Sequence, residues 1–302
     1  MPRRFLLRTC CALACALGWL GSGHEARAAE RPVVFAAIGD FGSAYPSTLA
    51  VSKLVKGWQP DFILTLGDNN YPAGAAETLD RNVGQYYYGF IHPYRGRFGP
   101  GALTNRFFPC LGNHDWMSRG AQPYLDYFAL PGNERYYTFK RGPVQLFCLD
   151  SDKQEPDGCT TNSIQARWLQ RELAVSTNRW KVVYFHHAPL SSGSYHGTWT
   201  GETRHLDWPF SDWGADAVLA GHDHIYERIH TNGIVYLVNG LGGDSRDALH
   251  YPLVAGSAKQ YNADFGALRV DATGNYLLFR FFNAHGALID MYRLPPVNAT
   301  KP

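Results

Sequence analysis

Seven polar residues of metal-ligating types stand shortly after apolar runs of this 302-residue chain. They comprise two aspartates, one tyrosine, one asparagine and three histidines. Carboxylate, phenolate, amide oxygen and imidazole groups are ligands suited to iron, zinc or manganese. The candidates, in chain order, are Asp40, Asp68, Tyr71, Asn113, His186, His222 and His224.

The apolar runs have the length and the β-branched or aromatic content of strands, and several are separated by segments of helical pattern. This alternation predicts α/β layering, and ligands bind at the carboxyl edge of such sheets. Ser163 is a candidate cap for the last helix, with Ile164, Trp168, Leu169 and Leu173 as its buried stripe. The expected strands are 33–38, 62–66, 107–111, 144–149, 181–185 and 217–220, the helices are 47–56, 78–90 and 163–175, and the closing antiparallel strands are 234–238, 266–270, 276–282 and 287–293.

Five motifs carry the seven candidates in a fixed order, and together they resemble the motif blocks of the purple acid phosphatases. That family belongs to the calcineurin-like metallophosphoesterase superfamily. The resemblance runs from about residue 33 to residue 293 and fits the short, single-domain form. It implies a metallophosphoesterase-type layered α/β/β/α sandwich with two mixed β-sheets. The motifs are Asp40-Phe41-Gly42, Gly67-Asp68-Asn69-Asn70-Tyr71, Gly112-Asn113-His114-Asp115, Val183-Tyr184-Phe185-His186 and Gly221-His222-Asp223-His224.

The resemblance implies a dinuclear metal centre and gives each ligand a place in it. Asp40, Tyr71 and His224 would hold the first metal, typically Fe(III). Asn113, His186 and His222 would hold the second, typically Fe(II), Zn(II) or Mn(II), and Asp68 would bridge both.

Tyr71 and Gly42 distinguish this pattern from that of many phosphodiesterases in the superfamily. Those enzymes have a histidine where this chain has Gly42, and they lack the tyrosine. Glycine has no side chain to ligate with, so Tyr71 can fill the gap.

Two adjacent histidines remain open as the ligand of the second metal. His186 fits the Val-x-x-His motif, and His187 fits a His-x-Pro pattern.

The reaction that the resemblance implies is hydrolysis of small phosphomonoesters by metal-activated hydroxide, as in an acid phosphatase. His114 and His196 are the candidates for binding phosphate and donating a proton to the departing alcohol. A phosphodiesterase or pyrophosphatase on the same metals is an alternative. A secreted binding protein that has lost catalysis is an alternative of another class.

The N-terminal residues have the features of a secretory signal peptide. A basic start precedes an apolar run, 10–21, that is too short to span a bilayer, and Ala-Arg-Ala at 26–28 fits a cleavage site. We therefore expect residues 1–28 to be a signal peptide, residues 29–302 to form a single catalytic domain, and the protein to be periplasmic or extracellular. The alternative is an N-terminal membrane anchor. Arg3-Arg4 also fits a twin-arginine export signal loosely.

The charge and the cysteine content limit which binding partners and disulfide bonds are expected. The formal charge of +2 gives no reason to expect nucleic-acid binding, and cleavage would leave no segment for stable membrane insertion. Three cysteines would remain after cleavage. Cys110 and Cys148 lie in apolar runs and are expected to be buried, and a bond between Cys148 and Cys159 is open in an oxidising compartment.

Overall fold

The computed structural model describes residues 1–2 and 31–294. The chain divides into two units, Met1–Glu30 and Arg31–Pro302. The expected signal peptide falls in the first unit and, apart from residues 1–2, lies outside the described residues. In the part of the chain that is described, no helix combines the length and the apolar character needed to cross a membrane.

Six strands form the first β-sheet, in the order β13-β12-β11-β1-β2-β3. Strands β1, β2 and β3 are parallel, and β11, β12 and β13 are antiparallel to their neighbours. The sheet is therefore mixed. Its strands are β1 Val33–Ile38, β2 Phe62–Thr65, β3 Phe107–Pro109, β11 Gly266–Ala272, β12 Leu277–Asn283 and β13 Leu288–Leu294.

Seven strands form the second β-sheet, in the order β10-β8-β9-β7-β6-β5-β4. Strands β5, β6, β7 and β9 are parallel, and the remaining pairs are antiparallel. This sheet is also mixed. Its strands are β4 Tyr137–Arg141, β5 Val144–Cys148, β6 Trp180–His187, β7 Ala217–Gly221, β8 Tyr226–Thr231, β9 Ile234–Asn239 and β10 Ser257–Tyr261.

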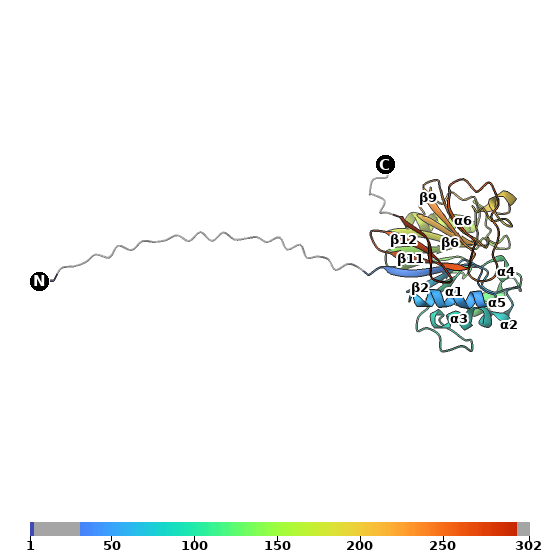
Figure 1. The fold of residues 1–302 in the computed structure, drawn as a ribbon, viewed down its shortest axis with the longest axis horizontal. Coiled ribbons are helices and arrows are strands. Elements are labelled where there is room, and N and C mark those ends of the chain that lie inside the picture. Colours follow the sequence, from blue (N-terminus) through green and yellow to red (C-terminus); the bar gives the residue numbers. More distant parts are fainter. Residues whose placement is uncertain (3–30, 295–302) are drawn as a thin grey trace. The chain divides into compact units, whose positions relative to one another are not determined.

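Helices cover the outer faces of both sheets, and the largest apolar core lies between the sheets. Helices α1 (Pro46–Gly57), α3 (Gln85–Tyr87) and α5 (Gln122–Tyr127) pack on the first sheet, whereas α6 (Ile164–Val175) packs on the second. Figure 1 shows α1, α3 and α5 on one side of the strands and α6 on the other. The expected α/β/β/α sandwich with two mixed sheets is confirmed.

The expected helix 78–90 is wrong in detail, because the segment changes its winding several times. It consists of α2 (Ala76–Leu79), a π-helical turn (Asp80–Gly84), α3 and a 3₁₀ turn (Tyr88–Phe90). In the π-helical turn, Asn82 Nδ2 donates to Tyr71 O at 3.0 Å and to Asn70 Oδ1 at 2.8 Å. A π-turn inside a helix is frequent at functional sites, and here it supports the segment that carries Tyr71.

Other departures from the sequence predictions are local. Ser163 caps α6 as expected, by accepting from Ala166 N at 3.0 Å, but Ile164 is exposed rather than part of the buried stripe. Cys148 and Cys159 are both free and buried, so the bond left open between them is absent. The strands β4, β8 and β10 were not predicted.

Candidate metal centre

Three of the seven candidates lie on sharp turns that follow β1, β2 and β7. Asp40, Asp68 and His222 have positive φ angles of 57°, 50° and 69°. This left-handed region is uncommon for residues other than glycine, and such strain persists where surrounding contacts enforce it. The turns bring side chains from both sheets to one place.

Two motif glycines have no side chain, and this lets the turns pack closely against one another. A Cβ atom on Gly67 would lie 2.4 Å from His186 Nδ1, and one on Gly112 would lie 2.2 Å from Asp68 Oδ1. Each of these glycines therefore contacts a candidate ligand from another motif. These two motif glycines have a steric role.

The first set of donor atoms surrounds the hydroxyl of Tyr71. Its oxygen lies 3.0 Å from Asp68 Oδ2, 3.3 Å from Asp40 Oδ1 and 3.3 Å from His224 Nε2. His224 Nε2 and Asp40 Oδ1 are also 3.3 Å apart. Four donor atoms at these separations suit coordination of a single cation, and phenolate with carboxylates suits a hard, highly charged one.

The second set of donor atoms surrounds His186 Nε2. This nitrogen lies 2.9 Å from Asn113 Oδ1, 3.1 Å from His222 Nδ1 and 3.5 Å from Asp68 Oδ1. The other ring nitrogen, Nδ1, lies 2.7 Å from the carbonyl oxygen of Leu66. Donation to that carbonyl leaves the Nε2 lone pair free for a metal, which is the usual outer-shell arrangement of a ligating histidine.

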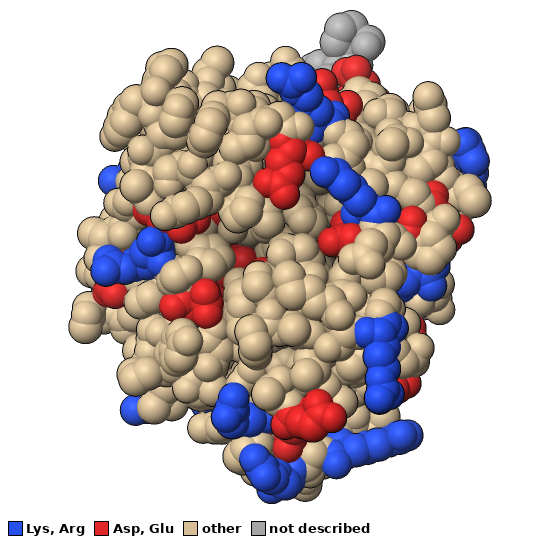
Figure 2. Space-filling view, turned by 90° about the vertical axis from the view of Figure 1, so that its right-hand side faces the viewer, with Lys and Arg blue, Asp and Glu red and all other residues tan. Residues whose placement is uncertain are grey.

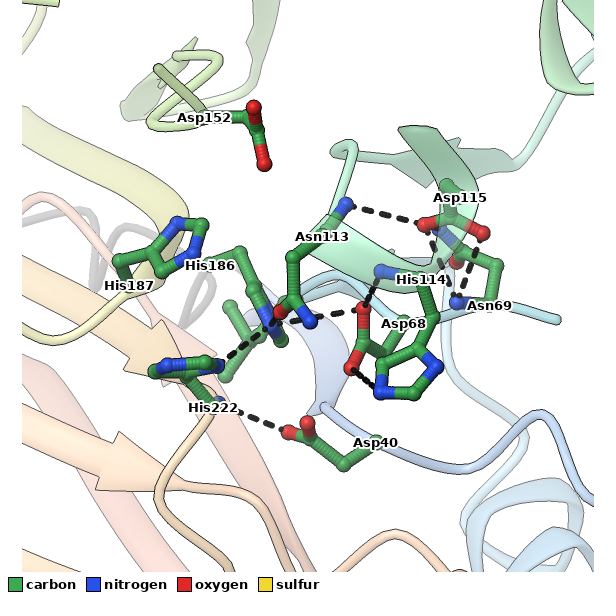
Figure 3. A network of polar contacts seen from close by, with 12 residues as sticks. Asp40, Asp68, Asn69, Asn113, His114, Asp115, Asp152, His186, His187 and His222 are labelled. Carbon is green, nitrogen blue, oxygen red and sulfur yellow. Dashed lines mark hydrogen bonds and ion pairs between the residues drawn. The ribbon is translucent and has the colours of Figure 1, made fainter. Parts of the chain in front are cut away.

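Asp68 lies between the two sets, with one carboxylate oxygen directed to each. Oδ2 faces the hydroxyl of Tyr71 and Oδ1 faces His186, while Oδ1 also accepts from His114 N at 2.9 Å. Figure 3 shows Asp68, Asn113, His186, His222 and Asp40 converging in this way. The donor set fits two cations that share one carboxylate.

The carboxylates and imidazoles of this site shift one another's pKa values. Asp40 and Asp68 are buried, and their ion pairs are all with histidines. Burial opposes ionisation of Asp68, but His186 and His114 outweigh that effect and lower the pKa of its carboxyl. Burial likewise disfavours charged imidazoles, but Asp68 raises the pKa of His186 to about 10 and Asp40 raises the pKa of His224 to about 9.

The same surroundings also favour the protonated form of Tyr71. Burial, together with the neighbouring charges of Asp68 and Asp40, raises the pKa of its phenol well above the usual range. A cation among these groups would oppose the raised pKa values of Tyr71, His186 and His224, because it would favour phenolate and neutral imidazole.

His187 lies beside the second donor set, because the ligating atoms of His186, His187 and His222 lie within 4.8 Å of one another, but its ring is engaged by the loop that follows β5. Its Nδ1 atom lies 2.8 Å from Ser151 Oγ, and the same hydroxyl accepts from His187 N at 3.0 Å. The pairing of β6 with β7 shifts register between Tyr184 and His187, and an irregularity of this kind re-aims side chains. This geometry favours His186 over His187 as the ligand.

Both candidate proton donors lie beside the donor atoms. His114 Nδ1 is 2.5 Å from the carbonyl oxygen of Pro72, and its Nε2 is 3.9 Å from Asp68 Oδ2. The ring of His196 lies 4.0 Å from that of His222, centroid to centroid. The structure thus brings all nine candidates to one site.

Two side chains at this site were missed from the sequence. Ser151 contacts His187, and Glu202 Oε2 lies 2.9 Å from His196 Nδ1. Ser151 lies two residues after the predicted strand 144–149, so its place at the carboxyl edge of the sheet could have been predicted from the sequence. Glu202 lies in a polar loop between two short 3₁₀ turns, Thr198–Thr200 and Arg204–Leu206, and no sequence pattern marks it.

Comparison with known proteins places this site in a family. The sequence profile of the calcineurin-like phosphoesterases matches residues 33–226, which contain all of the donor atoms described above. The chain belongs to the calcineurin-like phosphoesterase family. It is accordingly a metal-dependent phosphoric ester hydrolase, and the resemblance to purple acid phosphatases is confirmed by its relatives.

Those relatives include acid phosphatases from animals and plants. Tartrate-resistant acid phosphatase type 5 of Mus musculus is 24% identical over 258 residues, which cover 74% of this chain and 76% of that protein. Purple acid phosphatase 15 of Arabidopsis thaliana is 29% identical over 253 residues, which cover 70% of this chain and 45% of that protein.

Solved structures share the fold at lower identity. The purple acid phosphatase from yellow lupin (Lupinus luteus) has a TM-score of 0.72 and 18% identity, covering 87% of this chain and 54% of that one. GAP50 of Plasmodium has a TM-score of 0.68 and 17% identity, covering 89% of this chain and 90% of that one. The present chain therefore spans about half of the lupin protein and most of GAP50.

Proposed function

We propose that the chain is an exported dinuclear phosphatase of the acid phosphatase type, acting on small phosphomonoesters. The observation that carries this proposal is the arrangement around Asp68, whose two oxygens face two separate donor sets. The first set, with Tyr71, suits Fe(III), and the second set, with His186, suits Fe(II), Zn(II) or Mn(II). The acid phosphatases among the relatives support the same reaction.

When bound, two metal ions supply a clamp for the phosphate and a hydroxide nucleophile near neutral pH. The residues of the chain orient the ester and move the proton. Phosphorus gains the hydroxide oxygen and loses the alcohol oxygen, and the electron pair of the broken bond stays on that alcohol oxygen. His196 or His114 donates a proton to it.

The orientation of His114 agrees with such a role. Its Nδ1–H donates to Pro72 O, so Nε2 is the atom that faces the site. The ring lies 4.5 Å from that of Tyr71, centroid to centroid, and is tilted against it. An imidazole held in this way can meet a phosphate oxygen without taking a metal position.

The distribution of charge on one face of the molecule agrees with a small substrate. Basic and acidic side chains are interspersed on the face drawn in Figure 2, so that this face shows no broad patch of a single sign. A phosphate ester would be recognised by metal ions and imidazoles at the site, and extended electrostatic attraction of a polyanion has no counterpart on this face.

The test combines metal analysis, a visible spectrum and two substrates. We expect about two metal ions per chain, a tyrosinate-to-iron absorption band, and preference for 4-nitrophenyl phosphate over bis(4-nitrophenyl) phosphate. Tyr71→Phe should lose the band, and Tyr251→Phe, at a 69% exposed tyrosine, should keep it. Iron without a band in the wild type, or a band that survives Tyr71→Phe, contradicts the first-site assignment. Preference for the diester would favour the phosphodiesterase alternative.

The similarity of the fold to that of GAP50 leaves a binding protein as a second candidate function. That protein is the anchor in the inner membrane complex of Plasmodium, and its fold is similar to that of this chain. The fold alone therefore does not distinguish a hydrolase from an anchor. Failure of the purified protein to bind metal after reconstitution would favour this candidate over catalysis.

We also propose export through the N-terminal segment, with residues 1–28 removed and residues 29–302 forming a single catalytic domain. The expectation comes from the sequence features of a signal peptide. N-terminal sequencing of the protein recovered outside the cytoplasm should begin at Ala29. Recovery of the intact N-terminus in the membrane fraction would favour an anchor instead.

A further inference from the structure

One carboxylate outside the seven candidates is placed between two imidazoles of the site. Glu202 Oε2 lies 2.9 Å from His196 Nδ1, and Glu202 Oε1 lies 3.9 Å from His222 Nε2. His196, Glu202 and His222 form one of the side-chain clusters whose ligating atoms all lie within 4.8 Å of one another. A single side chain thus faces a candidate proton donor and a candidate metal ligand.

The second ring nitrogen of His222 needs a partner. Its Nδ1 atom belongs to the second donor set, 3.1 Å from His186 Nε2. Its Nε2 atom is buried and has no hydrogen-bond partner among the described residues. Metal-ligating histidines usually donate their second ring N–H to a carboxylate or carbonyl. A rotation of the Glu202 side chain that shortens the 3.9 Å separation would supply that acceptor.

The backbone of Glu202 is held in place on both sides. Glu202 N donates to Thr200 Oγ1 at 3.1 Å, and Glu202 O lies 3.2 Å from His205 Nδ1. The other nitrogen of His205 lies 3.4 Å from Ser151 O, in the loop after β5. The turn is therefore tied to the edge of the sheet where the donor atoms gather.

We propose that Glu202 is a positioning residue of the proposed phosphatase reaction. Its carboxylate accepts from His196 Nδ1–H, so that Nε2–H of His196 points toward the oxygen of the departing alcohol. Its second oxygen accepts from His222 Nε2–H, which keeps the Nδ1 lone pair of His222 directed at the second metal. One residue thereby couples the proton donor to the metal ligand.

The contribution of this residue should lie in orientation and not in folding. The side chains of His196 and Glu202 are 41% and 38% exposed, and ion pairs at such positions contribute little to stability. Removal of an outer-shell partner typically lowers metal affinity or activity by roughly 10- to 100-fold. Glu202→Gln and Glu202→Ala should therefore fold like the wild type while losing activity.

The experiment uses esters whose leaving groups differ in their need for a proton. Phenyl phosphate releases a basic phenolate, and 2,4-dinitrophenyl phosphate releases a stable one that leaves without protonation. We expect Glu202→Ala to reduce kcat on phenyl phosphate roughly 10- to 100-fold more than on 2,4-dinitrophenyl phosphate, with Glu202→Gln intermediate. Glu172→Gln, on helix α6, serves as the matched control and should behave like the wild type.

Metal titration of the same variants tests the second contact. Zinc binding at the second site should weaken in Glu202→Ala, and the absorption band that reports Tyr71 should persist. Equal loss of kcat on both esters, or no loss, overturns the positioning role while phosphatase activity of the wild type stands. A third equivalent of zinc in the wild type that Glu202→Ala abolishes also overturns it, in favour of a cation site. A wild type inactive on every monoester refutes the proposed function itself.

Discussion

Gly42 is a position where a very small substitution should have a large effect. A Cβ atom there would lie 2.1 Å from Asn69 O and 2.4 Å from Asn70 N. Gly42 O also accepts a hydrogen bond of 2.8 Å from Tyr71 N. The residue is therefore pressed against the segment that carries the candidate phenolate ligand, and Gly42→Ala is a test of that contact.

The cost of Gly42→Ala follows from the clash. Cβ atoms in proteins essentially never approach other heavy atoms within 3.0 Å, and here the opposing atoms belong to the backbone. The two segments must separate by roughly 1 Å, and overpacking of this kind costs about 1–3 kcal/mol. For a domain of this size, we expect Tm to fall by roughly 3–10 °C. Misplacement of Tyr71 by a similar distance should reduce kcat about 100-fold.

The assay measures Tm, iron content, the visible band and kcat on 4-nitrophenyl phosphate in one preparation. The matched control is Gly57→Ala at the end of α1, where a Cβ atom meets no other atom within 4 Å. That variant should be neutral or more stable by a few tenths of a kcal/mol, roughly, since alanine restricts the unfolded chain. The reasoning is refuted if Gly42→Ala matches Gly57→Ala in Tm and retains the band and the activity of the wild type.

Three further predictions concern ligation, protonation and capping. His186→Ala should lose the second metal, whereas His187→Ala should retain it because its ring faces the Ser151 hydroxyl; metal analysis showing the reverse would exchange the two roles. In the metal-free protein, the raised pKa values of His186 and His224 stabilise the fold fully below about pH 6.5, the value for unfolded histidine, and this contribution disappears as pH rises through about 9–10. The Tm of the metal-free protein should therefore decline from about pH 7 to about pH 10, and a flat or rising profile contradicts the assignment. Ser163→Ala should lower the free energy of unfolding by about 1 kcal/mol in urea titration without changing kcat, because only the cap of α6 is lost.

The predicted strands succeeded where burial makes the local pattern clear. Strands β5, β7 and β9 are buried along their whole length, and their apolar residues give a continuous signal. Strands β4 and β10 lie at the two edges of the second sheet and contain several polar residues, so no apolar run marks them. Edge strands exchange fewer contacts with the core, and their sequence is correspondingly less constrained.

The missed helix boundaries have a tertiary cause. The segment 78–90 has helical periodicity, but Asp80 accepts hydrogen bonds from the hydroxyls of Tyr94 and Tyr127. Asn82 meanwhile reaches the segment that carries Tyr71. These contacts come from distant parts of the chain, so a local window could not predict the π-helical turn that satisfies them.

The sequence by itself determined the kinds of ligand and their order along the chain. Strand-length runs that end in glycine, aspartate or histidine are local features, and the pairing of Gly42 with Tyr71 needs no distance to be recognised. The α/β layering followed from the same runs, and the resemblance to the purple acid phosphatases implied the sandwich of two mixed sheets. These properties depend on residue type and spacing, which the chain carries before it folds.

The tertiary structure decided which atoms meet. It gave His186 and His187 different partners, directed the two oxygens of Asp68 to different donor sets, and brought Glu202 beside His196. The first two depend on contacts between segments far apart in sequence, and Gly42 shows the same dependence. Its lack of a side chain is visible in the sequence, but only the packed backbone of Asn69 and Asn70 shows why nothing larger fits.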